Sequence, residues 1–160
     1  MALDFEMKVT YTMSMSFSDE EIESMIDTIL TLIPSSLAIE GINSHGYQKD
    51  NKWVPGWTIE KNDDGYWVFT VLEQDREIEL MNQFYGFKEG QVITLDRTYI
   101  KTKLPEIFDH GQVRHCFQWT YYPRDVLLEG IERGGGYVDV DSCVNDWFTE
   151  FLIFGNKIFG

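Results

Sequence analysis

The strongest constraint on the fold is a change of hydrophobic period at Ser18. Before this position, residues 5–17 alternate between apolar and polar side chains, the pattern of a strand with one buried face. After it, apolar residues recur every three or four positions up to Ile33, which is typical of an amphipathic helix, and Pro34 ends that helix. A long strand followed at once by a helix favours a fold that mixes both kinds of element.

The first turn of this predicted helix is unusually acidic. Ser18 and Glu21 have the spacing of a capping box, and negative charge in a first turn favours the helix dipole. Glu20, Glu23 and Asp27 share the face opposite the apolar stripe, and no Lys or Arg within the helix offsets them. We therefore take these three acids as a candidate surface for a basic partner.

The remaining chain contains turn signals between β-prone runs and further helical stretches. A polar turn at 62–65 predicts a hairpin, and a last helix is expected between Asp141, its N-cap, and Gly155, its C-terminal cap. These elements predict one α+β domain over residues 1–160, with a mainly antiparallel sheet and about four helices packed against it. We predict strands at 5–17, 37–42, 57–61, 66–72, 91–103 and 113–121, a loop at 43–56, and further helices at 74–85 and 124–133.

The formal net charge of -14 limits the partners of this 160-residue chain. A negative field repels nucleic acid and anionic membranes and attracts basic surfaces. No apolar run reaches the roughly 18 residues that cross a bilayer, and the N-terminus lacks the basic and apolar segments of a signal peptide. We therefore expect a soluble, cytoplasmic protein that binds neither nucleic acid nor membrane directly.

The sequence offers few soft metal ligands. Cys116 and Cys143 form no CxxC pair. A zinc site could combine His110, His115 and Cys116 with Cys143 as a fourth ligand, but the H-x4-H-C spacing matches no standard zinc pattern. On the predicted strand 113–121, His115 and Cys116 point to opposite faces, because neighbours on a strand do. We therefore predict two reduced thiols, no metal, no cofactor and no assignable catalytic residue.

The glycine run Gly134–Gly136, followed by Asp139 and Asp141, has two interpretations. Glycine-rich backbone can hold a phosphate and two carboxylates can hold magnesium, which with His110 would give a small metal-dependent hydrolase. However, neither GxxxxGK[ST] nor GxGxxG is present. The favoured interpretation is structural, because glycines end helices and Asp141 stands where a cap is needed.

Aromatic residues cluster with acids between positions 50 and 67. Trp is favoured at binding hot spots, and nearby acids suit a basic partner, although the same aromatics also fit an ordinary core. The predicted partner-binding residues, from this cluster and the first helix, are Glu20, Glu23, Asp27, Trp53, Trp57, Asp63, Asp64 and Trp67.

By size and charge, the chain is similar to small acidic inhibitors: toxin immunity proteins, phage proteins that block restriction or CRISPR enzymes, and DNA mimics. The similarity implies an inhibitor of this immunity or anti-CRISPR type that occludes the positive groove of a nuclease or another nucleic-acid-acting protein. Two alternatives remain. One is the metal-dependent hydrolase described above, and the other is an oligomeric structural or regulatory domain with the doubly apolar strand 66–72 at a subunit interface.

Overall fold

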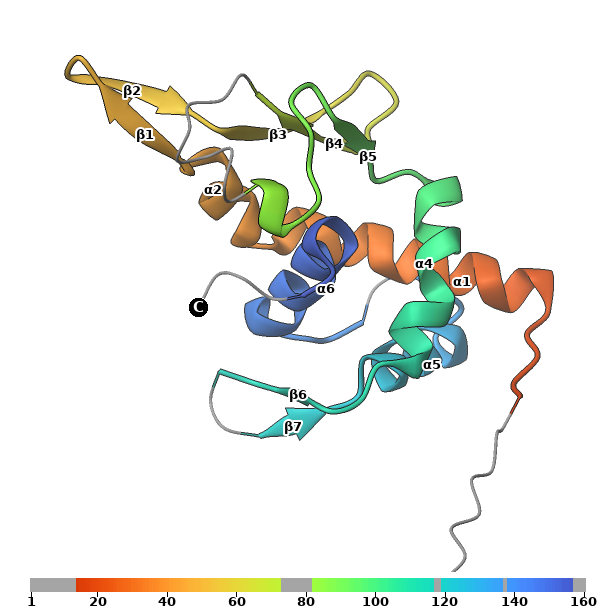
Figure 1. Ribbon diagram of the computed structural model, residues 1–160. Coiled ribbons are helices and arrows are strands. Elements are labelled where there is room, and N and C mark those ends of the chain that lie inside the picture. The colour runs from red at the N-terminus through yellow and green to blue at the C-terminus, as the bar shows by residue number, and fades with distance from the viewer. Residues whose placement is uncertain (1–13, 73–81, 117–118, 137, 157–160) are drawn as a thin grey trace, which may run out of the picture.

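The computed structural model describes residues 14–72, 82–116, 119–136 and 138–156 (Figure 1). The fold is α+β, as predicted, and its antiparallel strands divide among three small sheets. The order of elements is α1 (Asp19–Leu32), the 3-10 turn η1 (Ile33–Ser35), α2 (Ala38–Asn43), β1 (Gly46–Lys49), β2 (Lys52–Pro55), β3 (Trp57–Lys61), β4 (Trp67–Val71), β5 (Val92–Thr94), α4 (Arg97–Asp109), β6 (Val113–Arg114), β7 (Thr120–Tyr121), α5 (Pro123–Glu132) and α6 (Ser142–Phe154).

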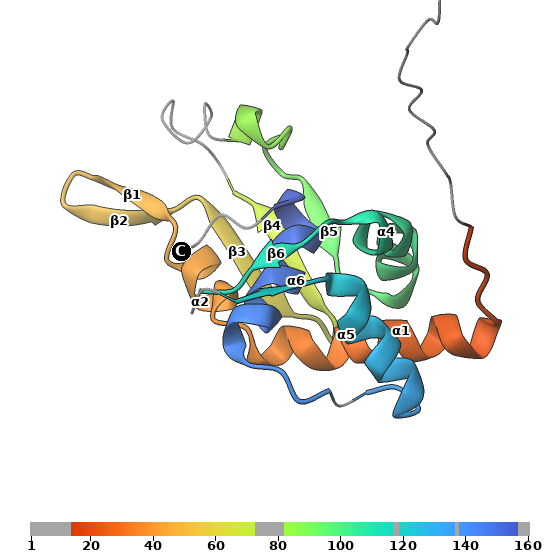
Figure 2. The ribbon, with the colours of Figure 1, turned by 90° about the horizontal axis from the view of Figure 1, so that it is seen from below.

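Helix α1 begins with the predicted capping box. The Ser18 hydroxyl accepts from the Glu21 amide at 3.2 Å, and the Ser18 amide donates to the Glu21 carboxylate at 3.0 Å. The helix ends where Pro34 lies in η1, and it packs against α4, α5 and α6 (Figures 1 and 2). Its predicted apolar stripe is buried in the core through Met25, Ile26, Ile29 and Leu32.

The contact between α1 and α5 depends on a missing side chain. A Cβ at Gly130 would lie 2.1 Å from the hydroxyl oxygen of Thr28, which is itself fully buried. Atoms this close overlap, so the two helices can approach only because α5 carries glycine at this position. Through this contact, α5 packs directly against α1.

Helix α6 is the most buried element, and both of its predicted caps are confirmed. The Asp141 side chain accepts from the amides of Cys143 and Val144, and Gly155 ends the helix with a φ of 74°. Every residue from Cys143 to Ile153 except Asp146 is buried. The start of α6 is therefore held by one carboxylate while the rest of the helix fills the core.

The predicted hairpin at 57–72 is confirmed as β3 and β4, with Ile59 opposite Phe69. Strand β4 lies between β3 and β5, so both of its backbone edges pair within the chain. The prediction of a strand over 91–103 is wrong beyond β5, because residues from Arg97 form α4. Asp96 caps that helix, accepting from the Tyr99 amide at 2.9 Å, and the cap prevails over local β-propensity.

Two other local predictions are also wrong. The predicted strand at 37–42 is wrong, because Ala38–Asn43 form α2. Six residues are too few for their apolar positions to separate the helical period from the strand period. Residues 43–56 contain the β1–β2 hairpin instead of a loop. Its turn uses positive φ values at Asp50 and Asn51, 52° and 61°, which these two residue types tolerate.

Some predictions fall on parts of the chain that the structure does not describe. Residues 14–18 have no regular structure, and the rest of the predicted strand 5–17 lies outside the described residues. The predicted helix 74–85 is described only from residue 82, with helix at 82–84. Within the described ranges, no helix has the length and apolar character needed to cross a membrane.

Candidate metal centre

Three side chains that commonly bind metals converge where the β6–β7 hairpin meets α6. His115 and Cys116 lie in the connection between β6 and β7, and Cys143 lies in the first turn of α6. One ligand atom from each lies within 4.8 Å of the other two. The Cys116 amide also donates to the Cys143 sulfur at 3.2 Å, which fixes the hairpin against the helix (Figure 2).

The prediction that His115 and Cys116 face opposite sides is wrong, because the strand ends before them. Strand β6 ends at Arg114, and one further backbone hydrogen bond, from the His115 amide to the Trp119 carbonyl at 2.7 Å, follows before the turn. The chain turns at Cys116, so the alternation of strand side chains no longer applies. As a result, the Cys116 sulfur lies 3.8 Å from Nδ1 of His115.

The imidazole of His115 is held on two sides. Its side chain is buried and stacks on Trp119, with ring centroids 4.1 Å apart. Its Nε2 lies 2.6 Å from a carboxylate oxygen of Asp141. In the tautomer that donates from Nε2 to this carboxylate, the Nδ1 lone pair points toward Cys116.

The two thiols have different surroundings. Cys143 is buried, and the backbone amide of Cys116 points at its sulfur. Cys116 is exposed, so the cluster can be reached from solvent. Tyr121 on β7 lines the same region: its pKa is raised first by burial and then by the negative charges of Cys143, Asp141 and Cys116. Tyr121 therefore remains a neutral phenol near physiological pH.

The geometry of the cluster suits a zinc ion. Zinc with tetrahedral bonds of about 2.3 Å to sulfur and about 2.0–2.1 Å to nitrogen holds its ligand atoms roughly 3.6–3.8 Å apart. The 3.8 Å between the Cys116 sulfur and His115 Nδ1 already matches, and the limit of 4.8 Å for the whole group requires shifts of no more than about an ångström. A carboxylate behind a ligating histidine is also the usual second partner at zinc sites.

The same residues allow one other chemistry. A thiol nucleophile at Cys116, a base at His115 and an orienting carboxylate at Asp141 would form a catalytic triad. That arrangement has no use for Cys143. The second sulfur, which completes a metal site, favours the metal over the triad.

The magnesium set predicted from sequence does not assemble. Among the described His, Cys, Asp and Glu side chains, the group that could hold a metal is the cluster at Cys116, and it excludes His110, Asp139 and Asp141 as ligands. The His110 ring packs edge-on against Trp147, at 5.0 Å between centroids. Gly134–Gly136 follow the end of α5 and all have positive φ, so the structural interpretation of the glycine run agrees with the fold.

The acidic face predicted on α1 is partly neutralised from another helix. Arg97 of α4 pairs with Asp27 at 2.7 Å and also with Glu23. Helix α1 itself carries no Lys or Arg, as the sequence shows, but α4 supplies Arg97 where the two helices meet. Glu20 is exposed and makes no ion pair with the other described residues.

The predicted aromatic partner-binding residues separate by burial. Trp57 is fully buried in the core, so its assignment to a partner surface is wrong. Trp67 is half-buried beneath the ammonium of Lys61. Trp53 on β2 is 51% exposed, and Asp63 and Asp64 are exposed at the turn between β3 and β4.

These residues do not form one patch. The β1–β2 hairpin, which carries Trp53, projects from one end of the molecule (Figures 1 and 2). The start of α1, which carries Glu20, lies at the opposite end. The surface predicted from sequence is therefore at least two separate surfaces.

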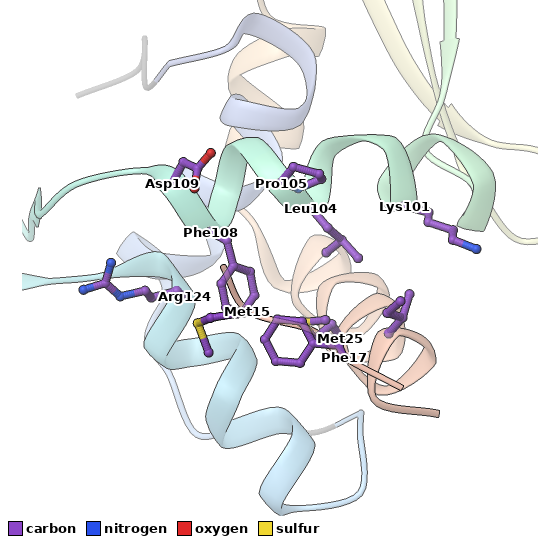
Figure 3. Close-up of a pocket in the computed structure, with 10 residues that line it drawn as sticks. Met15, Phe17, Met25, Lys101, Leu104, Pro105, Phe108, Asp109 and Arg124 are labelled. Carbon is purple, nitrogen blue, oxygen red and sulfur yellow. The ribbon is translucent and has the colours of Figure 1, made fainter. Parts of the chain in front are cut away.

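An apolar pocket of about 670 Å³ lies between α1, α4, α5 and the segment before α1 (Figure 3). Phe17 and Phe108 meet across it with ring centroids 5.0 Å apart. Asp19 stands one helical turn before Ile22, and Asp109 of α4 lines the pocket itself. The lining residues are Met15, Phe17, Ile22, Met25, Lys101, Leu104, Pro105, Phe108, Asp109 and Arg124.

Comparison with protein-family models, with curated proteins and with solved structures finds no match to this chain. The assignment of function therefore depends on the geometry described above.

Proposed function

We propose that the protein binds one zinc ion through Cys116, Cys143 and His115, and that the ion is catalytic. The observation that carries this proposal is the convergence of three ligand atoms within 4.8 Å from two elements of the fold. Structural zinc sites have four protein ligands, whereas catalytic sites have three and leave one position for water. The exposed side chain of Cys116 supports access to that position. A small zinc-dependent hydrolase is the function this arrangement supports best.

The residues of the chain would have separate roles in such an enzyme. Zinc bound here would supply a water of lowered pKa and a Lewis acid. The Trp119 ring covers one face of His115 and so limits rotation of the imidazole. The hydrogen bond from the Cys116 amide would hold the Cys143 sulfur in position beside the other two ligands. A reducing compartment such as the cytoplasm would keep both thiols available for the metal.

Zinc titration of the reduced protein tests this proposal. We expect one equivalent of zinc to bind, and Cys116→Ser and Cys143→Ser to weaken binding by more than 100-fold, because each removes a ligand. Asp139→Asn is the matched control: Asp139 is an exposed acid near the site in sequence and is not a ligand. Failure of the wild-type protein to bind stoichiometric zinc would refute the proposal, and rapid alkylation of Cys116 by iodoacetamide would then favour the triad.

The pocket beside α1 favours a second candidate function, binding of a basic partner. Apolar grooves that contain methionine accept the apolar face of an amphipathic helix, and Met15 and Met25 both line this one. Asp109 lines it and Asp19 stands one helical turn before Ile22. In a chain of net charge -14 these acids suit a basic helix, although Lys101 and Arg124 also line the pocket. We propose that such a helix belongs to a nucleic-acid-acting protein, which the chain would inhibit by occlusion.

A defined peptide tests this second function. We expect a basic amphipathic helical peptide to bind at low salt and to bind less tightly at high salt, because exposed charges are screened. Asp109→Lys should weaken binding, because Asp109 lines the pocket, and Asp63→Lys, at the β3–β4 turn, is the matched control. If both variants weaken binding equally, the effect comes from net charge alone. If both variants bind tightly in high salt, the acids do not take part in the interface.

A further inference from the structure

Asp141 uses its two carboxylate oxygens for two different tasks. Oδ1 accepts from the amide of Cys143 at 3.1 Å and from that of Val144 at 3.3 Å, which caps α6. Oδ2 lies 2.6 Å from Nε2 of His115, in the β6–β7 connection. One side chain therefore contacts both elements that carry the candidate ligands.

Each contact positions a different ligand. The bond to Nε2 sets the tautomer of His115, so that Nδ1 is the nitrogen available to a metal. The bond to the Cys143 amide fixes the backbone of the residue whose sulfur completes the cluster. The Cys116 amide then bonds to that same sulfur, which closes the arrangement.

We propose that Asp141 is the positioning residue of the metal centre, and that it couples zinc binding to the first turn of α6. This inference rests on the proposed zinc function. It gives Asp141 a role beyond capping α6, which is to hold two of the candidate ligands in position. A helix cap needs one acceptor oxygen, and the histidine needs another on the opposite side. A carboxylate is the side chain that supplies both.

Asparagine separates the two tasks because it has a single oxygen. Asn is as good an N-cap as Asp, so Asp141→Asn can keep the cap. Its amide nitrogen then faces Nε2 of His115 as a donor, which favours the tautomer with the proton on Nδ1. Zinc would have to displace that proton. Asp141→Ser also caps the helix but has no atom that reaches the imidazole.

The experiment measures zinc affinity by competition with a chromophoric chelator for wild type, Asp141→Asn, Asp141→Ser and the control Asp139→Asn. Loss of an outer partner of a ligating histidine typically weakens metal binding by 10–100-fold. We expect a loss in this range for both Asp141 variants. The metal-free melting temperature should stay close to wild type for Asp141→Asn and fall for Asp141→Ser, which leaves the buried imidazole without its carboxylate partner. Nitrogen-15 spectra of His115 in the metal-free protein should show the proton on Nε2 in wild type and on Nδ1 in Asp141→Asn.

The outcomes separate this inference from the zinc function. If wild type binds zinc and Asp141→Ser binds it equally well, Asp141 acts as a helix cap alone and the inference is wrong, while the zinc function stands. An unchanged His115 tautomer in Asp141→Asn would also overturn it. If wild type and Cys143→Ser alike fail to bind zinc, both the function and the positioning role fall together.

Discussion

Helices α1 and α6 both start with a first turn capped by a side chain, and the two caps differ in which parts of the chain they contact. At the start of α1, Ser18 and Glu21 bond to each other's backbone three residues apart, and the pair is exposed. At the start of α6, Asp141 caps the helix and also contacts His115, 26 residues away in the sequence. The first cap can serve its helix alone, whereas the second joins its helix to another part of the fold.

The charges at these two helix starts also have different surroundings. The acids of α1 face solvent, and the guanidinium of Arg97 pairs with Glu23 and Asp27 on the surface. The Asp141 side chain is exposed to a similar degree, 47%, but its carboxylate lies against a fully buried imidazole and accepts from the backbone amide of Cys143, whose thiol is buried. Acidity at a helix start therefore indicates function only where the acid also contacts chemically active groups from elsewhere in the chain.

The largest expected effect is stabilisation by zinc that acts through α6 and is independent of α1. A ligand that binds only the folded state stabilises it by about 4 kcal/mol at a thousand times its dissociation constant. We expect zinc to raise the melting temperature of wild type and of Ser18→Ala by similar amounts and to leave Cys143→Ser unchanged. Differential scanning calorimetry with and without zinc measures this. A zinc effect that survives in Cys143→Ser would place the metal elsewhere.

The metal-free protein should respond unequally to removal of the two caps. Ser18→Ala loses a local cap and should lower the free energy of unfolding by about 1 kcal/mol. Asp141→Ala loses a cap that contributes a similar free energy. It also leaves the buried imidazole of His115 without its carboxylate partner, which should lower the free energy of unfolding by about 1–3 kcal/mol more. Urea denaturation of both variants measures the difference. Equal losses would mean that the Asp141–His115 contact contributes nothing to stability and would remove the contrast between the caps.

Both caps could be predicted from sequence, since each is a local pattern. Ser18 with Glu21 has capping-box spacing, and Asp141 precedes a run with helical period, so the starts of α1 and α6 were found correctly. The α+β class followed from the same changes of period. At residues 37–42 the hydrophobic pattern was too short to predict helix α2. At residues 97–103 the helix cap at Asp96 outweighed the strand preference of the residues that follow it.

The metal centre could not be predicted, for a physical reason that applies to its three ligands. Cys143 comes near Cys116 only because α6 packs beside the β6–β7 hairpin, and no spacing rule encodes that contact. The alternation rule separated His115 from Cys116 because the strand was assumed to continue through them. Strand β6 contains only Val113 and Arg114, so the alternation of side chains along a strand does not extend to His115 or Cys116. The position where β6 ends was the missing information.

The smallest expected effect concerns the ion pairs of α1. Arg97→Ala should lower the free energy of unfolding by only about 0.2–1 kcal/mol, because Arg97, Glu23 and Asp27 are all partly exposed and their interaction is screened by water and salt. Lys103→Ala is the matched control on the same helix, since Lys103 pairs with Glu106 at 3.7 Å within α4. Urea denaturation at low and high salt should show a difference between the two variants that shrinks as salt is added. A loss well above 1 kcal/mol that persists in high salt would show that the acids of α1, like Asp141 at α6, are joined tightly to another part of the fold.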